Sequence, residues 1–367
     1  MQLELGSLRL KDYGELRLLE EVVLPIAREF DADTAVGDDC AIVGVDGSAL
    51  AVTTDYGPRP LVCSLPGYED DFEAWGWLAV VVSASDVAAS GARPVCMTNC
   101  IEAPPDFRVG DLARYVRGYF SACAEFGFRN GGGDLRCGSS LGIRVAAIGA
   151  CRRGGGVGRG GIEEGDRLVV IGPTGRFMAT YLLAAQYVGG KAGANGRLDP
   201  DMERVLRFPR PRLGEMAALA EAGVVVAASD TSDGLLGAIE NLSRSSGCGF
   251  DLDLNEALLP VEVKEAGDRG ALNPWNIFFA WGDWSVAAAV RAEEQERFLA
   301  ICREKEIAYT ELGSATGANG RVLARIDGGP PVEVRLVRNE NFASAGFNEG
   351  VKAHLHYLLK TSLFDRR

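Results

Sequence analysis

The stretch Val224-Val-Val-Ala-Ala-Ser-Asp-Thr-Ser-Asp-Gly-Leu235 decides the fold class. Its apolar start, Val224 to Ala228, has the length and β-branched content of a buried strand, and a helical pattern follows the stretch. At such a junction Ser232 or Asp233 can cap the helix, and free backbone N–H groups can face an anion. The same plan of strand, aspartate and helix occurs at Thr53-Thr-Asp55, so both halves of the chain mix strands with helices.

This pattern favours an α/β protein of the α+β type with two domains. The 367 residues, 47% of them hydrophobic and 24% charged, can bury a substantial core. The stretch Arg152-Arg-Gly-Gly-Gly-Val-Gly-Arg-Gly-Gly161 has the strongest linker composition in the chain and predicts the boundary. We expect an N-terminal helix or arm over 1–30, a first domain over 31–152, a second over 153–345 and a C-terminal tail over 346–367.

Hydrophobic periodicity and turn residues predict the other elements. Asp46-Gly47 lies between two short apolar runs, which indicates a β-hairpin whose second strand runs into Asp55. Helices are expected over 14–29, 73–90, 109–126, 177–187 and most of 203–222, and strands over 41–45, 49–54, 95–101, 141–150 and 167–172.

Charge and composition exclude several classes of function. The chain has 38 Lys and Arg against 51 Asp and Glu, a net charge of −13, and no basic run interleaved with aromatics, which argues against nucleic-acid binding. The apolar runs are too short to span a membrane and no signal-peptide pattern occurs, so we expect a cytoplasmic protein. His354 and His356 are the only histidines, which leaves no Ser-His-Asp or Cys-His-Asn set.

Two familiar nucleotide-binding motifs fail in context. Gly156-x-Gly158-x-x-Gly161 fits the dinucleotide fingerprint in letters, but a strand pattern follows it where a helix is required. Gly190-Lys191 lacks both the upstream glycine and the following Ser or Thr of a P-loop. Any nucleotide must therefore be bound by another arrangement.

A set of seven aspartates carries the strongest chemical signal. Each one alone is more simply explained as a turn residue or a helix cap. Asp86 differs, because it shares a stripe with Trp75, Ala79 and Val82 in a helix that is apolar nearly all round. A lone buried carboxylate would protonate or destabilise the fold, whereas a cation would satisfy it; an ion pair with an arginine is the alternative. The set is Asp38, Asp39, Asp55, Asp86, Asp134, Asp230 and Asp233.

The stretch Gly131-Gly-Gly-Asp134 adds a second kind of signal. Its glycines would let backbone approach a phosphate closely, and Asp134 could take a metal ion. Carboxylates that converge on one pocket repel each other, and Mg²⁺ relieves the repulsion while sharing its shell with phosphate oxygens. ATP with Mg²⁺ is therefore the expected ligand.

Six motifs, in this order and spacing, resemble those of thiamine-monophosphate kinase, a member of the aminoimidazole-ribonucleotide synthetase superfamily. The resemblance runs from about Gly14 to Ser246 and is weaker beyond. It implies a PurM-like fold of two α/β domains, and a homodimer in which the N-terminal mixed sheets join into a barrel. The motifs are Gly37-Asp-Asp-Cys-Ala41, Thr53-Thr-Asp55, Ser85-Asp-Val-Ala-Ala-Ser-Gly-Ala-Arg-Pro94, Gly132-Gly-Asp134, Pro209-Arg-Pro-Arg212 and Ser229-Asp-Thr-Ser-Asp-Gly-Leu235.

Carried over by matched position, the resemblance also implies the site residues. It implies that Mg²⁺ is bound by Asp39, Thr53, Thr54, Asp55, Asp86, Asp134 and Asp230, and a further ion by Asp233. It implies ATP contacts at Gly133, Asp134, Arg159 and Ser232. Asp55, Asp86 and Asp134 form the expected catalytic group, because ions that they hold would neutralise the transferred phosphoryl group.

Two positions depart from the thiamine-monophosphate kinase pattern. Val62 stands where those kinases have a histidine in the loop that holds the substrate phosphate, and Gly282 stands where they have a glutamate that touches substrate. We therefore expect a different acceptor. We assign its pocket to Arg59, Trp281, Trp284 and Phe342, although the tryptophans could equally belong to the core.

Three hypotheses of function remain. The leading one is a kinase that transfers a phosphoryl group from ATP to a small molecule other than thiamine monophosphate. The second is an ATP-dependent cyclase, dehydratase or amidine-forming ligase that activates an amide or carboxyl oxygen as a phosphate ester; the sequence does not separate these two. The third is a non-catalytic nucleotide-binding protein, against which the intact aspartate set argues.

Overall fold

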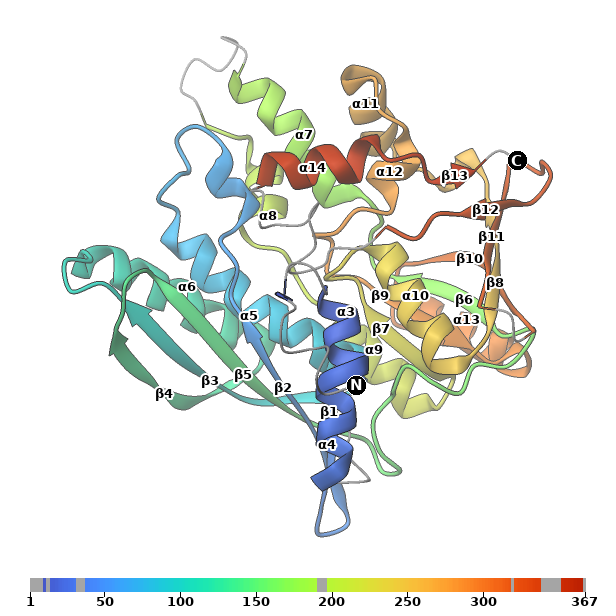
Figure 1. Ribbon diagram of the computed structural model, residues 1–367, viewed down its shortest axis with the longest axis horizontal. Coiled ribbons are helices and arrows are strands. Elements are labelled where there is room, and N and C mark those ends of the chain that lie inside the picture. The colour runs from blue at the N-terminus through green and yellow to red at the C-terminus, as the bar shows by residue number, and fades with distance from the viewer. Residues whose placement is uncertain are drawn as a thin grey trace.

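The protein is described by a computed structural model over residues 9–10, 14–30, 37–189, 197–317, 320–337 and 351–365. Two β-sheets organise it (Figure 1), one of five strands in the order β1-β2-β5-β3-β4 and one of eight in the order β13-β12-β11-β8-β10-β6-β9-β7. The first sheet contains β1 (Ala41–Val45), β2 (Ser48–Tyr56), β3 (Arg93–Ala103), β4 (Arg129–Cys137) and β5 (Gly142–Ala150). Both sheets are mixed, as the α/β prediction requires.

The first sheet begins with the predicted hairpin. Val45 pairs with Ser48 across the turn, and Asp46 and Gly47 have φ angles of 45° and 78°. Two successive left-handed residues give the two-residue turn whose twist matches that of the flanking strands. Strand β2 then extends to Tyr56, so Asp55 lies at its carboxyl end.

Helices α5 (Phe72–Ala89) and α6 (Val109–Phe126) pack on each other and on the first sheet (Figure 1). The helices approach closely at Gly76, where an added Cβ would lie 2.0 Å from the Tyr115 carbonyl oxygen. Asp71 caps α5 by accepting a hydrogen bond from the Ala74 N–H at 3.1 Å. By length and composition α5 could cross a membrane, but 67% of its residues are buried, as is usual for a core helix.

The second sheet and eight further helices make up the second half of the described structure. Its strands are β6 (Arg167–Ile171), β7 (Val225–Asp230), β8 (Gly249–Leu254), β9 (Val286–Val290), β10 (Tyr309–Thr316), β11 (Val322–Ile326), β12 (Val332–Val334) and β13 (Phe364–Asp365). Its helices are α7 (Arg176–Gly189), α8 (Pro200–Arg207), α9 (Leu213–Ala222), α10 (Leu235–Ser246), α11 (Val261–Gly270), α12 (Pro274–Phe278), α13 (Gln295–Glu304) and α14 (Val351–Lys360).

Alternate residues of β6 show how the domains are joined. Leu168 and Val170 belong to one core, which also contains residues between Leu61 and Ala74 of the first domain, whereas Val169 and Ile171 belong to a second core, which contains several residues of α5. Side chains alternate between the faces of a strand, so one short apolar run serves both cores. Both cores therefore contain residues of both domains, and α5 lies at the junction of the domains.

Three local predictions change in the structure. Gly131 to Asp134, which lay outside the predicted strands, lies within β4. The helix expected over 203–222 is broken into α8 and α9 around Pro209 and Pro211, because proline cannot continue a helix. The N-terminal helix is present as α3 (Glu15–Leu18), a π-helical turn (Leu19–Val23) and α4 (Leu24–Phe30).

Candidate active site

A cavity of about 520 Å³ lies at the domain junction, and aspartates from both domains line it. Asp55 comes from the end of β2, Asp86 from α5 and Asp230 from the end of β7. Asp39 precedes β1, and Asp233 lies in the turn between β7 and α10. Helix α5 packs against both β2 and β7, and in Figure 1 it lies between the two halves of the molecule. Five of the seven aspartates are thus brought together, as the sequence predicted, and Asp38 joins them at the cavity wall.

The centre of the cavity has the composition of a divalent-cation site. One carboxylate oxygen each of Asp39, Asp86 and Asp230 lie within 4.8 Å of one another. The Oδ2 atoms of Asp55 and Asp230 are buried and have no hydrogen-bond partner among the residues that the structure describes, although buried carboxylate oxygens are ordinarily satisfied. Several hard oxygen donors, two of them unsatisfied, are what Mg²⁺ prefers, so the residues present fit the expected ion.

Burial and mutual repulsion raise the carboxyl pKa values. Burial is the main cause at Asp86, whose pKa lies well above its usual range, with repulsion from Asp55, Asp230 and Asp39 adding to it. Burial also raises the pKa of Asp230 to about 7, and the nearby Asp39 contributes. The pKa values of Asp39 and Asp55 are raised for the same first reason. A cation at the centre would favour the charged form of all four groups.

Thr53 and Asp86 form the direct link between strand and helix. The Thr53 hydroxyl donates to Asp86 Oδ2 at 2.6 Å. No arginine of the described part of the chain forms an ion pair with Asp86, so the ion-pair alternative for this residue does not hold there. Asp86 keeps partial exposure, and it does so at the wall of the cavity.

Arg159 enters the same centre from the glycine-rich stretch between the domains. Its guanidinium donates to Asp39 Oδ1 at 2.7 Å and to the Gly37 carbonyl oxygen at 2.9 Å, and its backbone N–H donates to Asp38 at 2.7 Å. Its buried Nε has no partner. Arg159 was predicted to contact ATP, and the structure places it at the cavity beside the aspartates.

The turn from Asp230 to Leu235 is built differently from the prediction. Ser232 donates to Asp230 Oδ1 at 2.9 Å, and Gly234, with φ 89°, occupies the N-cap of α10 without a side-chain cap. The expectation that Ser232 or Asp233 caps this helix is therefore wrong. Both side chains line the cavity instead.

Three predicted site residues do not reach this cavity. Thr54 is exposed, because alternation along β2 places it on the opposite face from Thr53 and Asp55. Gly133 and Asp134 are also exposed, on β4. Strands β5 and β3 separate β4 from β2, a distance of roughly 14 Å at the usual strand spacing. Within one chain Asp134 is thus not a member of the aspartate group.

An aromatic wall closes the other half of the cavity. Trp281 and Trp284 both line it, and Trp284 also packs on Leu78 and Val81, so its core and pocket roles coexist. Arg59 lines the cavity as predicted and donates to the Glu69 carbonyl oxygen at 2.6 Å. Phe342, the fourth residue assigned to this pocket, lies outside the described residues.

Phe177 is a wall residue that sequence reasoning missed. Its ring centroid lies 6.0 Å from that of Trp281, and its backbone N–H donates to the buried Asp283 carboxylate at 2.8 Å. Gly282 has φ 109°, and a Cβ added there would lie 2.1 Å from Phe177 Cδ1. The ring therefore fills the space that a side chain at position 282 would need. No local pattern connects residues 177 and 282, so only the fold could reveal this contact.

Comparison with known proteins agrees with this architecture. The family model of the AIR synthase related protein N-terminal domain matches residues 37–151, and that of the C-terminal domain matches residues 163–325. Thiamine-monophosphate kinase of Methanospirillum hungatei is 31% identical over 251 residues, 67% of this chain and 77% of that protein. The Halobacterium salinarum enzyme of the same name is 30% identical over 293 residues, 80% of this chain and 89% of that protein.

Solved structures of such proteins also share the fold of this chain. The structure of AaThiL complexed with AMPPCP and TMP has a TM-score of 0.73 at 26% identity, and the match covers 92% of this chain and 99% of that one. The hydrogenase maturation protein HypE in complex with ATP is similar in fold alone, with a TM-score of 0.63 at 20% identity over 90% of this chain and 98% of that one. The chain therefore belongs to the AIR synthase related family, among the relatives of thiamine-monophosphate kinase, and is an ATP-dependent enzyme of the small-molecule kinase or ligase kind.

Proposed function

We propose that the protein transfers a phosphoryl group from ATP, with Mg²⁺, to a small molecule other than thiamine monophosphate. The observation that carries the proposal is the contrast within one cavity. Its aspartate half fits a metal and phosphate site, whereas its aromatic half lacks both polar side chains by which the resemblance would have it bind thiamine monophosphate.

The aspartate half supplies the metal ligands. Asp39, Asp86 and Asp230 would hold Mg²⁺, with Asp55 and Asp233 beside them. When bound there, the ion supplies positive charge that neutralises the transferred phosphoryl group. Arg159 adds a guanidinium at the same wall, and its unpartnered Nε–H is available to a phosphate oxygen. The residues of the chain thus act by positioning and by charge, without a covalent intermediate.

The acceptor half supports the second part of the proposal. Val62, which replaces the histidine, is fully buried in the core that also contains Leu168 and Val170, and it does not line the cavity. At position 282 the Phe177 ring leaves no room for the glutamate of the kinases that this chain resembles. Trp281 and Phe177 present flat apolar surface instead, which suits an acceptor with an aromatic or apolar body. Arg59, exposed at the rim, is the cation available to an anionic group on it.

We also propose that the enzyme acts as a homodimer. Strand β4, with Gly133 and Asp134, is exposed along its whole length, and Leu135 and Tyr56 of this sheet are 63% and 52% exposed. An uncovered apolar sheet surface favours association with a second sheet. A second protomer joined there could present its own Asp134 to the nucleotide, which would give this exposed residue the role that the resemblance implies.

Phosphorus NMR of ATP turnover against a panel of acceptors tests the reaction. A kinase converts ATP into ADP and a phosphorylated product, whereas the ligase alternative yields ADP and free phosphate. Turnover of thiamine monophosphate to the diphosphate would contradict the acceptor proposal. Failure to bind ATP in the presence of Mg²⁺, measured by calorimetry, would contradict the whole proposal and favour the non-catalytic alternative.

A further inference from the structure

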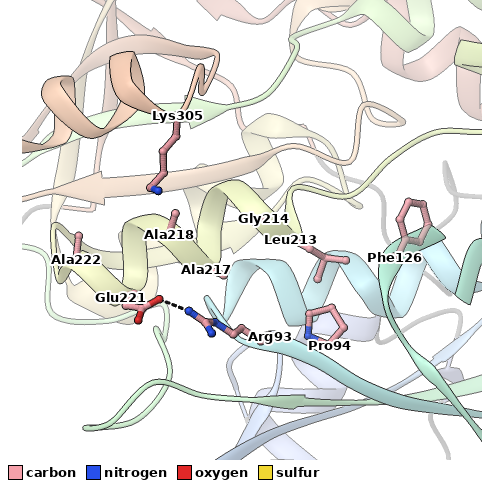
Figure 2. A pocket seen from close by; sticks show the side chains of 10 residues that line it. All are labelled: Arg93, Pro94, Phe126, Leu213, Gly214, Ala217, Ala218, Glu221, Ala222 and Lys305. Carbon is pink, nitrogen blue, oxygen red and sulfur yellow. Dashed lines mark hydrogen bonds and ion pairs between the residues drawn. The ribbon is translucent and has the colours of Figure 1, made fainter. Parts of the chain in front are cut away.

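Two further cavities lie side by side between the domains, outside the candidate active site. One cavity of about 610 Å³ and one of about 510 Å³ share Arg93, Ala217 and Glu221. Figure 2 shows the larger one, with Arg93 reaching from the start of β3 to Glu221 on α9, and Lys305 extending toward α9 from the opposite side. We name the two together the interdomain groove. No residue that lines it also lines the aspartate cavity.

The charge of the interdomain groove is opposite to that of the protein. Its charged lining residues are four cations, Arg93, Arg152, Arg153 and Lys305, and a single anion, Glu221. The whole chain carries −13, and the aspartate cavity is lined by seven acidic residues and two arginines. A positive site in so negative a protein concentrates small anions from solution.

Most of this positive charge is not neutralised locally. Glu221 is already taken by an ion pair with Arg93. Arg152 and Arg153 are exposed, and neither side chain forms an ion pair with any residue over the described ranges. Among the described residues, the one ion-pair partner of Lys305 is its sequence neighbour Glu304, at 3.9 Å. Three cations therefore remain available to a ligand.

The floor of the interdomain groove is apolar and made of small side chains. Ala217, Ala218 and Ala222 lie on the outer face of α9, and Pro94 and Phe126 close one end (Figure 2). The alanines leave open space above the helix, and the aromatic ring offers a surface for stacking. A ligand held here would touch β3 of the first domain and α9 of the second.

We propose that the interdomain groove binds an organic anion, a phosphate or carboxylate attached to an apolar body. Arg152 and Arg153, which line the smaller cavity, would bind the anionic group, since guanidinium forks match its oxygens, and Lys305, which lines the larger cavity, would add positive charge. The apolar body would lie on the alanines of α9, against Phe126. The site is separate from the proposed phosphoryl transfer, because it uses none of the same residues.

The test uses 1-anilinonaphthalene-8-sulfonate, an organic anion whose fluorescence rises in an apolar site. Its affinity for the full-length chain is measured, and then its displacement by inorganic phosphate, pyrophosphate and benzoate. Displacement by pyrophosphate but not benzoate identifies a phosphate-bearing ligand, and the reverse identifies a carboxylate. The affinity should fall as salt rises.

Variants assign the probe to the interdomain groove. Arg152→Ala with Arg153→Ala should weaken binding about thirtyfold, and Lys305→Ala about fivefold, since each partly exposed pair contributes about 1 kcal/mol. Ala218→Asp, which adds a carboxylate to the floor, should weaken it at least as much as Lys305→Ala. Arg303→Ala is the matched control, because it removes an exposed cation two residues from Lys305 that does not line the groove.

Two results would overturn the proposal. One is a probe affinity that is unchanged in the double arginine variant and in Ala218→Asp, which would place the probe elsewhere. The other is no displacement by any of the three competing anions. Asp86→Asn distinguishes this site from the proposed function, because it should abolish Mg²⁺-dependent ATP binding and leave probe binding unchanged.

Discussion

The two halves of the candidate active site differ in how many elements of the fold position their side chains. The aspartate half draws carboxylates from β2, α5 and β7, so its geometry depends on how both domains pack. The aromatic half comes mainly from the segment around Trp281 and from Phe177 at the start of α7. Five carboxylates converge in the first half, and apolar rings fill the second.

Under the proposed function, the fold keeps its phosphate chemistry while its acceptor changes, and the difference between the two halves gives a physical reason for this. A buried carboxylate cannot be replaced without leaving its neighbours unbalanced, because the carboxylates repel one another and would share the proposed Mg²⁺. The aromatic wall carries no charges that must be neutralised together. A glycine at position 282 requires only that one ring, that of Phe177, fills the space of the missing side chain. Substitutions in the aspartate half should therefore reduce activity, whereas substitutions in the aromatic half should mainly change stability and acceptor binding.

The largest effect is expected in the aspartate half. Asp86→Asn or Asp55→Asn should lower ATP turnover by about a thousandfold or more, because each removes charge that positions the metal and phosphoryl group. Asp106→Asn, at an exposed aspartate far along the chain from the cavity residues, is the control. Circular dichroism should show an unchanged fold. Near-normal turnover in both variants would remove the aspartates from the mechanism.

Thr53 and Thr54 provide a neighbouring comparison. Thr53→Val removes the hydroxyl that orients Asp86 and should weaken Mg²⁺-dependent ATP binding by about 10- to 100-fold, the usual range for a residue behind a metal ligand. Thr54→Val, on the exposed face of β2, should change it less than about twofold. Calorimetry of ATP binding at fixed Mg²⁺ measures both. Equal losses would show that Thr54 reaches the site.

The aromatic half is tested by restoring a side chain at position 282. Gly282→Glu should lower the free energy of unfolding by about 1 to 3 kcal/mol, because the new side chain overlaps Phe177 and the backbone is left-handed there. In a Phe177→Ala background the same substitution should lower the free energy of unfolding less, which chemical denaturation of the parent chain, both single variants and the double variant can measure. If Gly282→Glu alone is as stable as the parent chain, the ring does not fill this space.

The smallest effect is a pH dependence of stability. The pKa of Asp230 is raised from 3.8 to about 7, so the folded chain holds this proton more tightly than the unfolded chain. The resulting stabilisation is complete below about pH 4 and is lost as pH rises through 7. With a chelator present, the unfolding midpoint should be a few degrees higher at pH 5.5 than at pH 8. Asp230→Asn should flatten the difference, and an unchanged slope would contradict the assignment.

Much of the fold follows from local sequence patterns. The Asp46-Gly47 hairpin, α5 and α6 are where periodicity and turn residues predicted them, because nearby residues decide such elements. Asp86 was also identified correctly as a carboxylate in an apolar helix. These features need no knowledge of which strands are neighbours.

The differences from the sequence predictions concern mainly contacts between distant parts of the chain. Asp134 was grouped with the other aspartates, but within one chain the sheet order places β4 away from β2, and no local pattern encodes that order. Thr54 could have been set aside from sequence, because period-two alternation separates it from Thr53 and Asp55. The contact between Phe177 and Gly282 could not be predicted, because it depends on how α7 packs against the turn before β9.

The central claim is that the ATP half is retained while the acceptor half has changed. Calorimetric titration of thiamine monophosphate into the chain loaded with Mg²⁺ and AMPPCP tests it most directly, beside the Methanospirillum hungatei enzyme as a positive control. We predict Mg²⁺-dependent binding of AMPPCP by both proteins and binding of thiamine monophosphate by the relative alone. Comparable binding of thiamine monophosphate by this chain would contradict the account.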